Sequence, residues 1–92
     1  MLADVRHEIN GIDDELIPLL VRRLRLADDV AAAKRAEGRA IDDPVRETAI
    51  LESMVARVPA DCAEAMTTVY RTIFACSKAR QRAGLGAGSD VI

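Results

Sequence analysis

The chain lacks a basic excess, long apolar runs and nearly all aromatic side chains. Lys and Arg total 13 against 15 Asp and Glu among 92 residues, for a formal net charge of −2. Nucleic-acid-binding domains usually carry a basic excess, so no nucleic-acid partner is expected. No apolar run approaches the roughly 18 residues that a membrane helix needs, and the N-terminus lacks the basic-then-apolar order of a secretory signal. We therefore expect a cytoplasmic protein without a membrane partner.

Residues that form disulfides or hold metals are also scarce. Cys62 and Cys76 lie far apart and form no Cys-x-x-Cys motif, so we interpret both as ordinary small apolar residues. His7 is the only histidine and has no neighbouring ligand residues, so no zinc site is expected. Tyr70 and Phe74 are the only aromatic residues. The remaining composition, rich in Ala, Leu, Arg and Glu, is typical of a helical protein.

Heptad periodicity predicts one long helix over residues 4–37. Its apolar residues recur at alternating spacings of four and three, the pattern of a helix buried along one seam. The seam residues are Val5, Ile9, Ile12, Leu16, Leu19, Leu26, Val30 and Ala33. Gly38 is the expected C-terminal cap. Pro18 leaves two outcomes open: a break into two shorter helices, or a bent but continuous helix, which the unbroken heptad phase favours.

Two shorter helices follow in an all-α fold. Asp43 is a candidate N-cap and Pro44 suits a first helical turn, so a second helix is predicted from there to a stop near Pro59. A third helix is predicted over about 61–82, with no strand pattern anywhere. Residues 84–92 are rich in glycine and are predicted to be a flexible tail, which leaves 1–83 as one helical domain.

The first helix is too long for a compact monomer. About 34 residues span roughly 50 Å, whereas a compact chain of this length is only about 30 Å across. Two shorter helices cannot cover such a seam, and a second copy of the chain is the simplest partner that can. The predicted assembly is therefore a homodimer.

A set of polar residues falls on these otherwise apolar faces. Arg23 takes a seam position, and Lys34 lies eleven residues, or about three turns, further on, so both point nearly the same way. Ser77 and Gln81 are four residues apart, where the apolar face of the third helix would continue. The start of the second helix adds Asp43, Arg46 and Glu47.

Two interpretations of this polar set compete. Buried charge is costly unless it is paired, so Arg23 and Lys34 could be neutralised by Glu47 and Asp43 in an internal ion-pair network. Alternatively, the cations and the neutral donors line a polar pocket for a small carboxylate. The convergence of so many polar residues favours the pocket.

In this order and spacing, the residues resemble the all-helical (AroQ-type) chorismate mutases over about Leu2 to Arg82. The resemblance is carried by Val5-Arg6, Ile9, Ile12-Asp13, Leu16, Leu19-Leu20, Arg23, Leu26-Ala27, Val30, Lys34, Asp43-Pro44-Val45-Arg46-Glu47, Ile50-Leu51, Ser77 and Gln81. It implies an intertwined homodimer with two equivalent sites. It also implies an isomerase that rearranges chorismate to prephenate in aromatic amino acid biosynthesis, without a cofactor or a metal.

The resemblance implies that four residues serve the carboxylates of the substrate. Arginines matching Arg6 and Arg23 bind the two carboxylates, and residues matching Arg46 and Ser77 support that binding. Arg6 and Arg23 are seventeen residues apart, about 25 Å along a continuous helix, and point about 100° apart. They cannot hold one small molecule from the same chain, so Arg6 is expected to reach the partner's site.

The other four residues are implied to face the reacting part of the substrate. Residues matching Lys34 and Gln81 reach the ether oxygen whose bond breaks, and those matching Asp43 and Glu47 meet the ring hydroxyl. The candidate catalytic residues are Arg23, Lys34, Glu47 and Gln81. Three alternatives stay open: a lyase that releases pyruvate from isochorismate, a mutase that acts on 4-amino-4-deoxychorismate, and a helical dimer that binds a partner or an effector and catalyses nothing.

Overall fold

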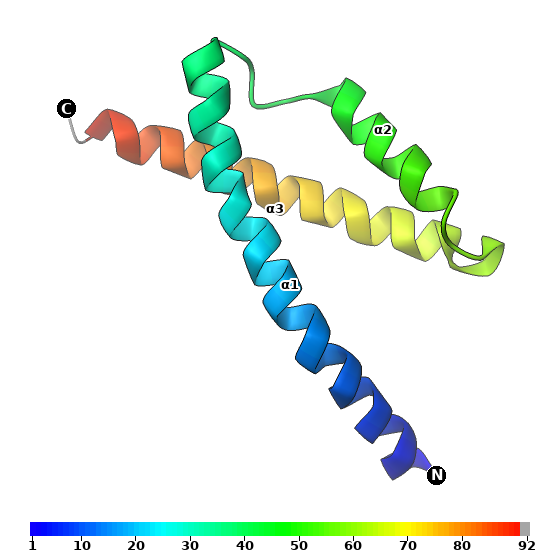
Figure 1. Ribbon diagram of the computed structural model, residues 1–92. Helices are drawn as coiled ribbons and strands as arrows, with labels where there is room; N and C mark the ends of the chain where they lie inside the picture. Colours follow the sequence, from blue (N-terminus) through cyan, green and yellow to red (C-terminus); the bar gives the residue numbers. More distant parts are fainter. Residues whose placement is uncertain (91–92) are drawn as a thin grey trace.

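The chain folds into three helices and a short 3-10 turn. The computed structural model describes the backbone of residues 1–90 and the side chains of residues 1–84. Its elements are α1 (Leu2–Glu37), α2 (Pro44–Val55), η1 (Ala60–Cys62) and α3 (Ala63–Asp90), and the described backbone contains no strand (Figure 1). The prediction of an all-α fold with one long helix and two shorter ones is confirmed.

α1 is one continuous helix that contains Pro18, so the alternative of a break at this proline is wrong. The helix ends at Gly38, whose φ of 66° lies in the left-handed region that glycine adopts without a steric penalty. The Gly38 N–H donates to the carbonyl of Arg35 at 3.2 Å, and the Arg39 N–H donates to the carbonyl of Lys34 at 2.8 Å. These two bonds satisfy carbonyls at the end of the helix and confirm the predicted cap.

α2 begins where its sequence signals place it. The Asp43 carboxylate accepts a hydrogen bond from the Arg46 N–H at 3.1 Å, and Pro44 occupies the first helical turn. Such a cap satisfies one of the backbone donors that a helix start leaves without a partner. It also fixes Arg46 and Glu47 in the first turn of α2, where both line a pocket together with residues of α1 and α3.

α3 extends further than predicted, to Asp90 rather than to about residue 82. Once a helix has formed, each added residue closes one more backbone hydrogen bond, and glycine weakens a helix by about 1 kcal/mol per residue without forbidding it. Residues 91–92 of the predicted tail lie outside the described residues. The flexibility expected for 84–92 stays a prediction.

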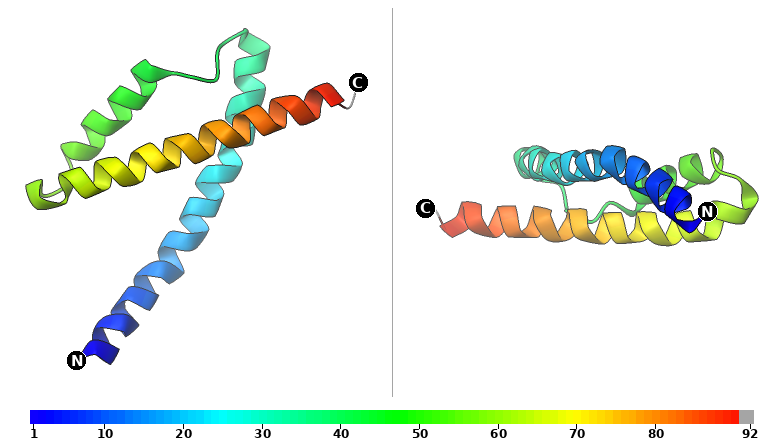
Figure 2. Two further views of the ribbon diagram at one scale, coloured as in Figure 1. Left: turned by 180° about the vertical axis from the view of Figure 1, so that it is seen from behind. Right: turned by 90° about the horizontal axis from the view of Figure 1, so that it is seen from below.

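α3 packs against both other helices and holds the fold together. Figure 2 shows it as one layer, with α1 and α2 on the other side. α3 crosses α1 in the last third of α1, where Ala27 and Ala31 are the only residues of that helix that are buried. Small side chains let two helix backbones approach closely. Both oxygens of the Asp28 carboxylate accept bonds of 3.0 Å from the Arg80 guanidinium, which ties the two helices at this crossing.

The isolated chain is not compact. Its radius of gyration is 16.6 Å and its extents are 57 × 27 × 14 Å, whereas a compact chain of this length has a radius of about 12 Å. The N-terminal half of α1 projects away from α2 and α3 (Figure 1). The large seam side chains are 42–60% exposed; they are Val5, Ile9, Ile12, Leu16, Leu19, Leu26 and Val30. The chain by itself therefore leaves its most regular apolar surface uncovered.

Two predictions about the chemical setting can be compared with the structure. None of the described helices is long and apolar enough to cross a membrane. Cys62 and Cys76 are free thiols on exposed positions, so they form no disulfide with each other. The cytoplasmic location stays a prediction.

Burial predicts which apolar residue of α2 the fold depends on most. Met54 is 3% exposed, whereas Val45, on the same helix, is 81% exposed. We expect Met54→Ala to lower the free energy of unfolding by about 2–5 kcal/mol, because it removes buried methylene groups and leaves a cavity. Val45→Ala should change it by less than about 0.5 kcal/mol. Denaturant unfolding at one chain concentration tests this, and equal effects of the two variants would contradict the packing described above.

Candidate active site

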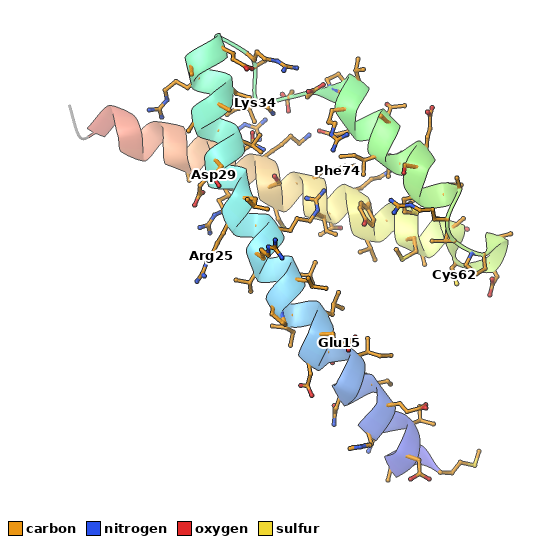
Figure 3. All side chains as sticks on the ribbon, viewed as in Figure 1. Glu15, Arg25, Asp29, Lys34, Cys62 and Phe74 are labelled. Carbon is orange, nitrogen blue, oxygen red and sulfur yellow. The ribbon has the colours of Figure 1, made fainter. Side chains whose placement is uncertain are left out.

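A partly open pocket with a volume of about 610 Å³ lies between the three helices. Its walls come from α1 between Arg23 and Glu37, the 38–43 loop, the first turns of α2 and the middle of α3. Lys34 of α1 and Phe74 of α3 lie on the sides of their helices that face α2 (Figure 3). A pocket of this size suits a small organic molecule.

The pocket gathers seven of the eight residues that the sequence singled out. Its walls include Arg23, Lys34, Asp43, Arg46, Glu47, Ser77 and Gln81. All four candidate catalytic residues are among them. The eighth, Arg6, is an exposed residue near the start of α1 and does not line this pocket. The continuous α1 keeps Arg6 about 25 Å from Arg23, as the spacing in the sequence predicts.

A hydrogen-bonded chain of three side chains joins α1 to α3 inside the pocket. Lys34 Nζ donates to the Ile41 carbonyl and, at 3.2 Å, to Gln81 Oε1. Gln81 Nε2 donates to Ser77 Oγ at 3.2 Å. An ammonium group can only donate, so Lys34 fixes which end of the Gln81 amide faces it. Gln81 is only 4% exposed, and its two hydrogen bonds hold the buried amide in one orientation.

The carboxylates of the pocket pair with cations other than Arg23 and Lys34. Glu47 Oε2 lies 3.1 Å from Lys78 Nζ, and Asp43 Oδ2 lies 3.5 Å from the Arg39 guanidinium. The hydrogen bond to Glu47 is the largest influence on Lys78 and raises the pKa of its ammonium above the ordinary value. The internal network in which Glu47 and Asp43 neutralise Arg23 and Lys34 is therefore wrong. The reason is that α3 and the 38–43 loop bring nearer cations to both carboxylates.

This pairing leaves the pocket with unbalanced positive charge. Its walls carry five cationic side chains and three carboxylates, the third being Glu37, which lies 3.7 Å from Arg39. Arg23, Lys34 and Arg46 form no ion pair with any described residue. Cations that line a cavity without carboxylate partners attract an anionic ligand. The arrangement can hold a small carboxylate and place buried donors beside it.

Sequence reasoning missed three charged residues of the pocket, Glu37, Arg39 and Lys78, and also the Ile41 carbonyl that accepts a bond from Lys34. Lys78 follows Phe74 by four residues and so shares its helix face, which is a signal that could have identified it. No local pattern could have paired Lys78 with Glu47, because thirty-one residues separate them in the chain. A backbone carbonyl carries no sequence signal at all.

The chain matches one family profile and is similar in sequence to three curated proteins. The profile of the family described as chorismate mutase type II matches residues 5–82. The chain is 42% identical over 52 residues to a T-protein of Haemophilus influenzae and 43% identical over 54 residues to a bifunctional chorismate mutase/prephenate dehydratase of Enterobacter agglomerans. It is 41% identical over 51 residues to a chorismate mutase of Methanocaldococcus jannaschii. No solved structure matches.

These alignments cover different shares of the proteins. They include 56%, 59% and 55% of this chain, in the same order, but only 14%, 14% and 52% of the relatives. This chain therefore corresponds to about half of one relative and to a small part of the other two. The family profile, by contrast, extends from α1 through α3 up to Arg82 and includes every residue that lines the pocket. The chain belongs to the chorismate mutase type II family.

Proposed function

We propose that this chain is a chorismate mutase, which rearranges chorismate to prephenate in aromatic amino acid biosynthesis and acts as an intertwined homodimer. One observation carries the proposal: Arg23, Lys34 and Arg46 line a single pocket without carboxylate partners in the described part of the chain. Chorismate is a small dicarboxylate, so its charge complements these cations. Membership of the family supports the same substrate.

The reaction is intramolecular, so the protein's first task is positioning. The enolpyruvyl group must lie over the ring while one carbon–oxygen bond breaks and one carbon–carbon bond forms. Holding both carboxylates restricts the flexible substrate to conformations in which the reacting carbons are close, which removes much of the entropic barrier. Arg23 would hold one carboxylate with the support of Arg46 and Ser77, which line the same pocket.

The second task is to stabilise the negative charge that grows on the ether oxygen as its bond breaks. Lys34 and Gln81 are adjacent donors, joined by a bond of 3.2 Å. Gln81 Nε2 donates one of its two N–H groups to Ser77, and the other would donate to the ether oxygen of bound substrate. Donors held in place before the reaction stabilise such charge without reorganising during it. Glu47 or Asp43 would accept the single hydrogen bond that the ring hydroxyl donates.

A second copy of the chain would cover the exposed apolar seam of α1 and would also complete the pocket. It would bury the exposed seam of α1, where side chains such as Ile12 are 60% exposed. It would also bring its own Arg6 to the pocket, to bind the second carboxylate. In a two-fold dimer the same contact occurs twice and creates two equivalent sites.

The products formed from three related substrates test the activity. We expect purified protein to convert chorismate to prephenate, because the pocket presents cations for two carboxylates and a carboxylate pair for a hydroxyl. Isochorismate should release little pyruvate, and 4-amino-4-deoxychorismate should be rearranged poorly. Chromatographic identification of the products decides among these. A chain that forms dimers yet converts none of the three would be a binding protein, and the proposal would be wrong.

Among the pocket residues, Lys34 is the one whose removal we expect to lower kcat most. We expect Lys34→Ala to lower kcat about 100- to 1000-fold, the usual effect of removing one preorganised donor at a developing oxyanion. Arg25→Ala removes a cation from the same helix outside this pocket and should leave kcat close to the unsubstituted value. Steady-state kinetics measures both, and circular dichroism should show equal helix content. Turnover by Lys34→Ala at the unsubstituted rate would reject the assigned role.

Mixing two inactive variants tests whether each site draws on two chains. Arg6→Ala and Lys34→Ala should each be nearly inactive. In a heterodimer of the two, one site combines an intact Lys34 with the partner copy's intact Arg6. Random exchange in an equal mixture should therefore restore about one quarter of the unsubstituted activity, since half of the dimers carry one good site of two. No recovery despite proven subunit exchange would mean that Arg6 serves the site of its own chain, and full activity of Arg6→Ala alone would mean that it serves no site.

A further inference from the structure

Lys78 is a charged residue of the pocket to which the proposed function gives no role. It follows Ser77 on α3 and its side chain is 25% exposed. Its Nζ lies 3.1 Å from Glu47 Oε2 and 3.5 Å from Asp42 Oδ1. It is therefore placed between one carboxylate of the pocket wall and one carboxylate of the 38–43 loop.

Glu47 depends on Lys78 more than Asp42 does. Asp42 is 64% exposed and also accepts a bond of 3.1 Å from the Arg82 guanidinium, so it keeps a cation if Lys78 is removed. Glu47 is 29% exposed and forms no other ion pair with the described residues. Without Lys78, the less exposed of the two carboxylates would lose the one charged partner that holds its position.

We propose that Lys78 is a positioning and specificity-determining residue that acts through Glu47. Its ammonium holds the carboxylate in one place and offsets its charge, so this end of the pocket accepts a neutral hydroxyl in preference to an ammonium group. The inference rests on the proposed function, which assigns Glu47 to the ring hydroxyl. A substrate that carries an amino group there would bring a second cation within a few ångströms of Lys78, and the two would repel each other.

Six variants of the full chain test this role: Lys78→Met, Lys78→Arg, Lys78→Gln, Arg82→Met, Glu47→Gln and the double variant Lys78→Met/Glu47→Gln. Kinetics with chorismate gives kcat and KM, and 4-amino-4-deoxychorismate added as a competitor gives an inhibition constant. We expect Lys78→Met to lower kcat/KM up to about 100-fold through misplacement of Glu47. It should also tighten inhibition by the amino compound about tenfold relative to KM, because the repelling charge is gone. Lys78→Arg should restore both values.

The control variants separate this role from two others. Arg82→Met removes the other cation that pairs with Asp42. It should change neither kcat/KM for chorismate nor the inhibition constant of the amino compound. If it lowered kcat/KM as much as Lys78→Met does, the role of Lys78 would be to hold the 38–43 loop, and the proposal would be wrong. Lys78→Met added to Glu47→Gln should cause no further loss. A further loss of the same size would show that Lys78 contacts the substrate itself and would overturn the proposal, as would an unchanged preference for the hydroxyl. Lys78→Gln gives the same readouts if the methionine variant does not fold.

The outcomes also distinguish this inference from the proposed function. A chain without substitutions that fails to convert chorismate contradicts the proposed function. A chain that converts chorismate equally well with and without Lys78 contradicts only the role of Lys78.

Discussion

The crossing of α3 over α1 at Ala27 and Ala31 is the contact on which the pocket depends. These two small residues are buried to 3% and 4% exposure, and the Arg80–Asp28 ion pair holds the same crossing from outside. Lys34 follows Ala31 by three residues on α1. The crossing therefore brings its side chain within hydrogen-bond distance of Gln81, forty-seven residues away in the chain. A slip of one helical turn, about 5.4 Å, would separate these side chains beyond hydrogen-bond reach and would open the buried end of the pocket.

Unequal pairing of charges gives that pocket its chemical character. Glu47 and Asp43 pair with Lys78 and Arg39, which leaves Arg23 and Lys34 without carboxylate partners among the described residues. Cations left in this way attract an anion, and their effect is stronger in a partly enclosed pocket than in open water. The same pairing keeps the carboxylates in fixed places as hydrogen-bond acceptors. Under the proposed function, one distribution of ion pairs would account for the recognition of both an anion and a hydroxyl.

The exposed half of α1 matters for both the stability and the proposed function of the protein. A chain with a radius of gyration of 16.6 Å buries little of its apolar seam, and unburied apolar surface is the main driving force for association. Arg6 lies on the same projecting half of α1, too far from the pocket of its own chain. The homodimer that we propose therefore completes the fold and the site by one contact, and a substitution in the seam should affect both.

The sequence by itself determined that three helices form, where α1 ends and α2 begins, and most of the residues that line the pocket, but not how far α3 extends. Heptad spacing, Gly38 and the Asp43-Pro44 pair are local signals, because helix periodicity and capping act within a few residues. Polar residues on apolar faces identified Arg23, Lys34 and Gln81. Only the tertiary structure decided which charges pair: Glu47 with Lys78 instead of Arg23 or Lys34, and the Ile41 carbonyl with Lys34. Pairing depends on distances between helices that are far apart in the chain, and no local pattern encodes those distances.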